Sequence, residues 1–242
     1  MLFMILLIGH LLADFSLQSS NMAENKQKNT KVLLTHGGIY LLVFTAINFV
    51  FLNPIIAIWA TLIICTTHLL IDFIRTKIDR RIEGRQLRFL TFIVDQVLHV
   101  AIIIVAYYLL NLSAQCNSIY RYCESYRHFN KIIMHSLLFV ALFDPAAVFV
   151  KKSFAFLFRE EASDNPGNNA GSMIGKLERT ITAILLLCNQ YSAIGLVLTA
   201  KSIARFKQLE DQGFAEKYLI GTLLSLSISL IATLAVKYIL SL

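Results

Sequence analysis

The sequence consists mostly of apolar runs, separated by short polar segments. Because a helix needs about 20 apolar residues to cross a bilayer, the candidate spans are 2–18, 32–52, 55–74, 88–111, 131–157, 174–200 and 217–241. Only 15% of the residues are charged, whereas a soluble domain carries about a quarter. The sequence therefore predicts an all-α fold, a polytopic membrane helix bundle of about seven spans that forms a single domain over residues 1–242.

The basic residues lie mainly in the connections between the apolar runs. Lys and Arg are concentrated in residues 26–31 and 75–88, and cytoplasmic loops carry an excess of these residues. We therefore expect both connections in the cytoplasm, with the N-terminus and the hairpin at Asn53 outside. This distribution accounts for the net charge of +7. The expected partner is the lipid bilayer and not nucleic acid, because no phosphate-binding loop or RNA-binding signature is present.

The segment 174–200 conflicts with this topology. As a straight span, which is the simpler prediction, it would place Lys201 and Arg205 outside the cell, against the rule for basic residues. The alternative is a re-entrant or broken helix near 188–195, in the stretch CNQYSAIG, which returns both residues to the cytoplasm. Non-helical backbone at membrane depth is tolerated where it lines a cavity.

Acidic and imidazole side chains recur inside the first four candidate spans. They are the pairs His10 and Asp14, His68 and Asp72, and Asp95 and His99, together with the isolated His36. The two members of each pair are four residues apart and share a helix face. At 1.5 Å per residue, all seven lie about 5–17 Å from the cytoplasmic ends of their helices. We therefore expect residues 1–112 to form a four-helix bundle with a His/Asp polar core, and residues 113–242 to form the C-terminal spans.

Ionisable groups inside a membrane span are costly and usually functional. The imidazole and carboxylate groups suit a divalent transition metal, with zinc as the first choice and manganese or iron as alternatives. The expected metal ligands are His10, Asp14, His68, Asp72, Asp95 and His99, and the expected catalytic residues are His36, as a ligand or general base, and Asp95. A catalytic zinc uses about three protein ligands, so the set indicates two metals or some supporting groups. A proton or ion pathway and a structural polar network remain alternatives.

A second polar set lies in the last third of the chain. Its members are Glu178, Arg179, Lys201, Ser202 and Arg205. The simplest interpretation is that these charges flank a span and reach toward the lipid headgroups. The alternative is a binding site for a phosphate or a lipid headgroup, because Lys and Arg pair with phosphate. In that case the substrate-binding residues are Glu178, Lys201, Ser202 and Arg205.

Several motifs follow one another in an order that resembles a known family. They are GHLLADFSLQ (9–18), His36, HLLIDF (68–73), DQVLH (95–99), ER (178–179), AKSIARF (200–206) and YLIGTLLS (218–225). Together they resemble a bacterial integral membrane family classified as a domain of unknown function, which implies a multi-pass protein of the inner membrane. The His-x-x-x-Asp spacing is also similar to that of predicted membrane-bound metal-dependent hydrolases.

These observations favour a membrane-embedded metal-dependent hydrolase that acts on a membrane-associated (phospho)ester or lipid substrate. The alternatives are a metal-ion or proton-coupled transporter and a non-catalytic membrane partner protein. A transporter needs a polar path to both faces, and the outer halves of the first four spans contain few polar residues, which favours the enzyme. Cys116 and Cys123 share an outer loop and could pair there, and no feature of the sequence indicates an oligomeric state.

Overall fold

The computed structural model describes residues 1–26, 29–158 and 168–241, and these ranges contain helices and no strand. Residues 27–28, in the basic connection 26–31, lie outside them. The chain divides into two compact units, residues 1–137 and 138–242, with the boundary inside α7 (Phe129–Phe158). The organisation of residues 1–242 as a single domain stays a prediction.

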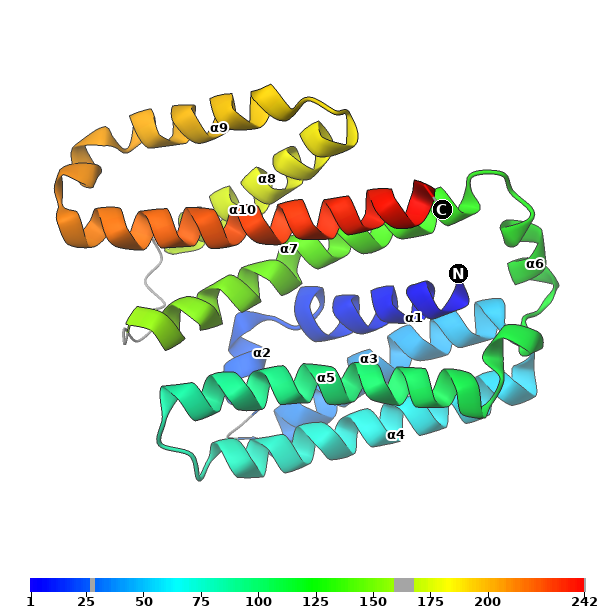
Figure 1. Ribbon diagram of the computed structural model, residues 1–242. Coiled ribbons are helices and arrows are strands. Elements are labelled where there is room, and N and C mark those ends of the chain that lie inside the picture. The colour runs from blue at the N-terminus through cyan, green and yellow to red at the C-terminus, as the bar shows by residue number, and fades with distance from the viewer. Residues whose placement is uncertain (27–28, 159–167, 242) are drawn as a thin grey trace. The chain divides into compact units, whose positions relative to one another are not determined.

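The first unit contains four apolar helices that run alongside one another (Figure 1). Its elements are α1 (Leu2–Leu11), the π-helix η1 (Leu12–Ser16), α2 (Ser20–Asn25), α3 (Thr30–Phe51), α4 (Pro54–Asp79), α5 (Arg85–Leu109), the 3₁₀ helix η2 (Leu112–Gln115) and α6 (Ser118–Glu124). Helix α3 packs on α4, and α4 packs on α5. Because α1 contacts both α3 and α5, it completes the bundle.

The boundaries of these helices follow local sequence signals. The side chain of Asn29 accepts a hydrogen bond from a backbone N–H in the first turn of α3, as expected of an N-cap asparagine. Pro54 occupies the first turn of α4, where the missing N–H has no helical partner in any case. Between the two helices, Asn53 donates its backbone N–H to the carbonyl of Gln115 at 3.0 Å, which ties the hairpin to the segment that follows α5.

An apolar layer lies next to the predicted His/Asp residues. Leu6, Phe44, Ile64 and Ile103 are fully buried in the core of the first unit. Each lies one or two helical turns from one of the four histidines, on the same helix face. Between membrane helices such a layer stabilises association by close van der Waals packing, because lipid tails are as apolar as the side chains. This layer therefore holds together the helices that carry the predicted site.

Five helices are long and apolar enough to cross a membrane, namely α3, α4, α5, α7 and α10 (Gln212–Ser241). The chain thus has the character of a multi-pass membrane protein, but the predicted seven spans are not confirmed. In place of the span 2–18, α1 and η1 cover only Leu2–Ser16. At 1.5 Å per residue this segment is about 22 Å long, short of the hydrocarbon core of about 30 Å.

The straight helix predicted over 174–200 is wrong, and the broken form is present. Helix α8 (Asn168–Leu187) ends before Cys188, and α9 (Tyr191–Ala204) runs back beside it (Figure 1). The 3₁₀ helix η3 (Phe206–Glu210) then leads into α10. Asn189 has a φ of 58°, and the N–H of Gln190 donates to the carbonyl of Leu185 at 2.8 Å. These are the features of a Schellman end, which hydropathy alone does not reveal.

The left-handed backbone at Asn189 makes a direct test of this turn possible. Alanine is strained at such a φ and glycine is not, whereas both substitutions remove the asparagine amide, which bonds Lys237. We expect Asn189→Ala to lower the free energy of unfolding by about 1 kcal/mol more than Asn189→Gly does. Unfolding in mixed detergent micelles measures the difference. Equal stability of the two variants would contradict the left-handed turn.

The four cysteines are free thiols, including Cys116 and Cys123 in the segment between α5 and α7. Cys116 is buried, and burial raises the pKa of its thiol. A raised pKa keeps the thiol protonated and lowers its reactivity. Cys116 therefore acts as a packing residue in this structure.

Candidate metal site

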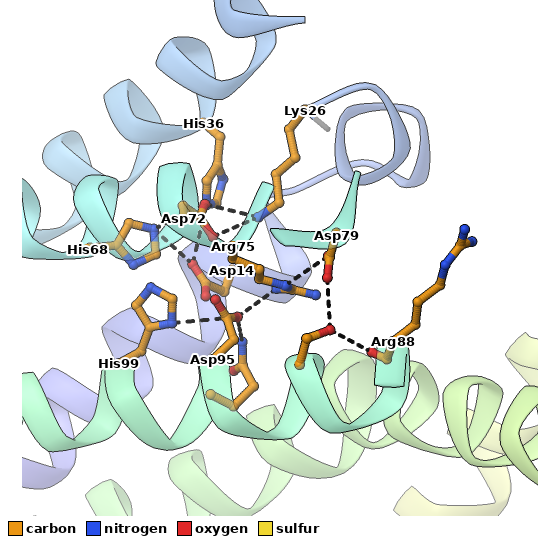
Figure 2. Close-up of polar contacts among 12 residues, drawn as sticks. Asp14, Lys26, His36, His68, Asp72, Arg75, Asp79, Arg88, Asp95 and His99 are labelled. Carbon is orange, nitrogen blue, oxygen red and sulfur yellow. Dashed lines mark hydrogen bonds and ion pairs between the residues drawn. The ribbon is translucent and has the colours of Figure 1, made fainter. Parts of the chain in front are cut away.

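All seven predicted His and Asp residues come together in the first unit. His10 lies on α1, Asp14 on η1, His36 on α3, His68 and Asp72 on α4, and Asp95 and His99 on α5. None is more than 8% exposed. Figure 2 shows six of them, from four different elements, pointing toward one another. The seven residues, which the sequence predicts at a similar depth in the membrane, therefore form one buried cluster.

Four donor atoms of this cluster lie around the two facing imidazoles of His36 and His68, and we call their residues the four-donor cage: Asp14, His36, His68 and Asp72. Nε2 of His36 lies 3.3 Å from Nε2 of His68 and 3.4 Å from one carboxylate oxygen each of Asp14 and Asp72. Nε2 of His68 lies 3.5 and 3.8 Å from the same two oxygens. Ligands about 2.0–2.2 Å from a tetrahedral zinc are about 3.3–3.6 Å apart. The distances from each of the two Nε2 atoms to the other donor atoms are close to this geometry.

The groups of the cage do not satisfy one another by hydrogen bonding alone. Two imidazole nitrogens can form a hydrogen bond only if one is protonated and the other is not. Oδ1 of Asp14 is buried without a hydrogen-bond partner in the part of the chain that the structure describes. Burying a carboxylate oxygen in this way is costly. A cation between the two Nε2 atoms and the two carboxylates removes both problems.

The π-helix η1 places Asp14 in the cage. Its defining hydrogen bond runs from the N–H of Leu17 to the carbonyl of Leu12 at 2.8 Å, one residue wider than an α-helical turn. Such turns occur frequently at functional sites. Oδ2 of Asp14 stays 3.7 Å from Nδ1 of His10, while Oδ1 faces His36 and His68.

Tyr40 supports the cage, although the sequence analysis did not single it out. Its ring stacks on the imidazole of His68 with the centroids 3.6 Å apart, and its hydroxyl lies 3.3 Å from Nδ1 of His10. These contacts fix the plane of His68 and thereby the direction of its Nε2 atom. The position of Tyr40, one turn after His36 on the same face of α3, is a signal that could have identified it.

Two cations contact the carboxylates of the cluster. Nζ of Lys26 lies 3.0 and 3.3 Å from the two oxygens of Asp72, and Nη1 of Arg75 lies 2.6 Å from Oδ2 of Asp95. In Figure 2 they reach the carboxylates from the side away from His68 and His99. Arg75 follows Asp72 by three residues on α4, so the sequence spacing alone indicates that Arg75 lies near the cluster. Lys26 contacts Asp72 across 46 positions of the chain, and no sequence pattern indicates this contact.

Asp95 and His99 flank the cage with unsatisfied atoms. Nδ1 of His99 lies 3.6 Å from Oδ2 of Asp95. Oδ1 of Asp95 and both ring nitrogens of His99 are buried and lack hydrogen-bond partners within the described ranges. Asp72, Asp95 and His99 each offer a donor atom, all within 4.8 Å of one another, and so do His10, Asp14 and His68. The cluster thus has more potential ligands than one metal ion needs.

The predicted substrate-binding residues lie in the second unit. Lys201 Nζ pairs with Glu178 at 2.7 Å, so its charge is compensated within the set. Ser202 lies 3.4 Å from the hydroxyl of Tyr218, and the guanidinium of Arg205 lies over the Tyr218 ring at 5.8 Å. These four residues therefore lie near one another in the second unit, while the His/Asp cluster belongs to the first unit, and their role in substrate binding stays a prediction.

The model of the family described as "Protein of unknown function (DUF3307)" matches residues 2–129. The chain belongs to this family. The match includes all seven His and Asp residues of the cluster and ends inside the first unit, so the motifs at 178–225 lie outside it. No curated protein and no solved structure matches the chain.

Proposed function

We propose that the chain is a membrane-embedded, metal-dependent hydrolase of a membrane-associated (phospho)ester or lipid in the bacterial inner membrane. The observation that carries this proposal is the four-donor cage, in which the Nε2 atoms of His36 and His68 lie from each other and from the two carboxylates at distances like those between the ligands of one metal ion. Imidazole and carboxylate donors in this arrangement favour zinc, with manganese or iron as alternatives. Such an ion lowers the pKa of a bound water toward neutrality.

The residues beside the cage have the properties that hydrolysis requires. In this proposal His36 is a metal ligand and Asp95 is the general base, because Oδ1 of Asp95 is free of hydrogen bonds to the described residues. Asp95 takes a proton from water as the water oxygen bonds to the phosphorus or carbonyl carbon of the ester. The bond to the alcohol oxygen breaks, and the same proton goes to the departing alcohol. Arg75, 2.6 Å from Asp95, holds the carboxylate in place.

The distribution of buried polar residues favours an enzyme over a transporter. Among the described residues of the first unit, Asn48 and Thr61 are the buried polar pair between the cluster and the Asn53 hairpin. They bond each other at 2.9 Å, and neither is ionisable. Because ion transport needs a polar path to both faces, this arrangement supports a site that opens toward one side only.

Activity of Asp95→Asn tests the proposal. We expect purified wild-type protein in lipid nanodiscs to hydrolyse ester lipids after zinc loading and to lose this activity in chelator. The side-chain amide of the variant cannot accept the proton, so the rate should fall by about 10²–10⁴-fold. The matched control is Glu83→Gln, which changes an exposed carboxylate in the α4–α5 connection. Equal rates in zinc and chelator would contradict hydrolysis, and zinc uptake into vesicles would then support transport.

We also propose that the cluster opens toward the cytoplasm. The basic connection between α4 and α5 supports this orientation, and the cluster lies at the same end of these helices. In a cysteine-free variant, a cysteine at position 53 should react with an impermeant thiol reagent outside the cell. A cysteine at position 81 should react only after the membrane is opened. The opposite pattern would place the cluster toward the outside.

A further inference from the structure

The side chains at the rim of the four-donor cage indicate the class of substrate that reaches it. The cage side chains are at most 5% exposed, whereas those of Lys26 and Arg75 are 10% and 15% exposed. The two cations therefore lie between the buried donors and the surface. Figure 2 shows both on one side of Asp72 and Asp95, so a molecule that enters from this side meets them first.

A metal in the cage would leave Lys26 with a cationic neighbour. Nζ of Lys26 is 3.0 Å from Oδ2 of Asp72, which is one of the four donor atoms. With a metal–oxygen bond of about 2.0–2.2 Å, the ammonium and the ion can be no more than about 5 Å apart. Like charges at this separation repel each other strongly in a buried environment. The single charge of Asp72 lies between the two cations and offsets part of this repulsion, and a further anionic oxygen bound to both offsets the rest.

Arg75 adds a second positive charge at the rim that an anionic ligand can compensate. It bonds Asp95 through Nη1 and pairs with Asp79 through Nε at 3.4 Å, so both carboxylates hold its guanidinium in one place. The Nη2 atom takes part in neither of these two contacts, so it can bind an anion at the rim while Nη1 keeps Asp95 in place. A guanidinium and an ammonium side by side match the several oxygens of a phosphate group. A neutral carboxylic ester offers no charge to either cation.

We infer that the substrate of this site is a phosphate ester, whose non-bridging oxygens bind the metal together with Lys26 and Arg75. This inference rests on the proposed function. In the metal-free protein the two cations balance the charges of Asp72 and Asp95. In the metal-loaded protein they bind the substrate, which makes them specificity residues. In this proposal they take the phosphate-binding role that the sequence analysis gave to Glu178, Lys201, Ser202 and Arg205.

Binding of inorganic phosphate to detergent-purified protein tests the inference, with zinc bound and after chelation. Because coupling between two ligands is reciprocal, zinc should tighten phosphate binding and phosphate should tighten zinc binding by the same factor, at least about tenfold. Lys26→Gln and Arg75→Gln should each remove most of this coupling while the protein still binds zinc. Lys26→Arg should keep it, because the charge is kept. The control is Lys77→Gln, an exposed cation on the same helix as Arg75.

A second arm identifies the source of the phosphate. If short-chain phosphatidate binds more tightly than inorganic phosphate, and the diacylglycerol control does not bind, the substrate is a lipid. If phosphatidate and inorganic phosphate bind equally well, the substrate is a soluble phosphate ester. Zinc binding without any effect of phosphate, or phosphate coupling that survives in both Gln variants, overturns the inference and leaves the metal site intact. Failure of the protein to bind zinc at all overturns both proposals.

Discussion

Replacing His68 with alanine is expected to lower zinc affinity by a factor on the order of 100 or more. Loss of a residue that merely supports a ligand costs about 10–100-fold, and His68 offers a donor atom directly. Its Nε2 atom lies within 3.8 Å of the donor atoms of the other three cage residues. Competition with a chromophoric chelator measures the affinity in detergent solution.

His128→Ala is the matched control, because His128 is exposed in the segment before α7 and takes no part in the cluster. It should bind zinc as tightly as the wild type. Tyr40→Phe keeps the ring that stacks on His68 and removes only the hydroxyl, so its loss of affinity should be smaller than that of His68→Ala. If all three variants bind zinc equally well, the metal is held elsewhere.

Replacing Arg179 with methionine is expected to destabilise the protein by about 2–4 kcal/mol. Arg179 is 3% exposed and donates to the carbonyls of Leu142 and Phe143, at 2.8 and 3.4 Å. These carbonyls belong to the turn before Pro145, where a proline weakens the hydrogen bonds of α7. A third bond, to Ser225 at 3.1 Å, links α8 to α10. Methionine keeps the apolar stem but removes all three hydrogen bonds.

Unfolding in mixed micelles, with and without zinc, measures this effect. Lys207→Met removes an exposed cation from the same unit and should change stability by less than about 0.5 kcal/mol. Zinc binding should be unchanged in Arg179→Met, since the cage belongs to the first unit. An Arg179→Met protein as stable as the Lys207→Met control would show that Arg179 does not hold the second unit together.

The sequence predicted the cluster well because its spacing has a direct geometric meaning. Residues four apart on a helix share a face, and apolar surroundings on the remaining faces leave the bundle interior as the place for His68 and Asp72. The polar residues lie at similar distances from the basic ends of their four segments, and this predicted that all seven share one depth in the membrane. Hydropathy likewise predicted α3, α4, α5, α7 and α10 as long apolar helices.

Other features depend on contacts that no local pattern contains. The wide turn at η1 has no sequence signature that we could identify, and the contact between Lys26 and Asp72 joins residues 46 positions apart. The break between α8 and α9 depends on one residue, Asn189, which tolerates the left-handed conformation. A hydropathy window averages over such a residue and predicts a straight span. The basic residues Lys201 and Arg205 carried the better signal, because their charge already conflicted with that span.

X-ray absorption at the metal edge of purified, zinc-loaded protein tests the central claim most directly. The cage predicts one zinc ion per chain with two imidazole nitrogens and two carboxylate oxygens at about 2.0–2.2 Å, and a second ion beside it only at higher zinc concentration. The imidazole signal should fall in His36→Ala and His68→Ala. Purified protein that takes up no zinc, manganese or iron, or a spectrum unchanged by both substitutions, would contradict a metal site in the four-donor cage.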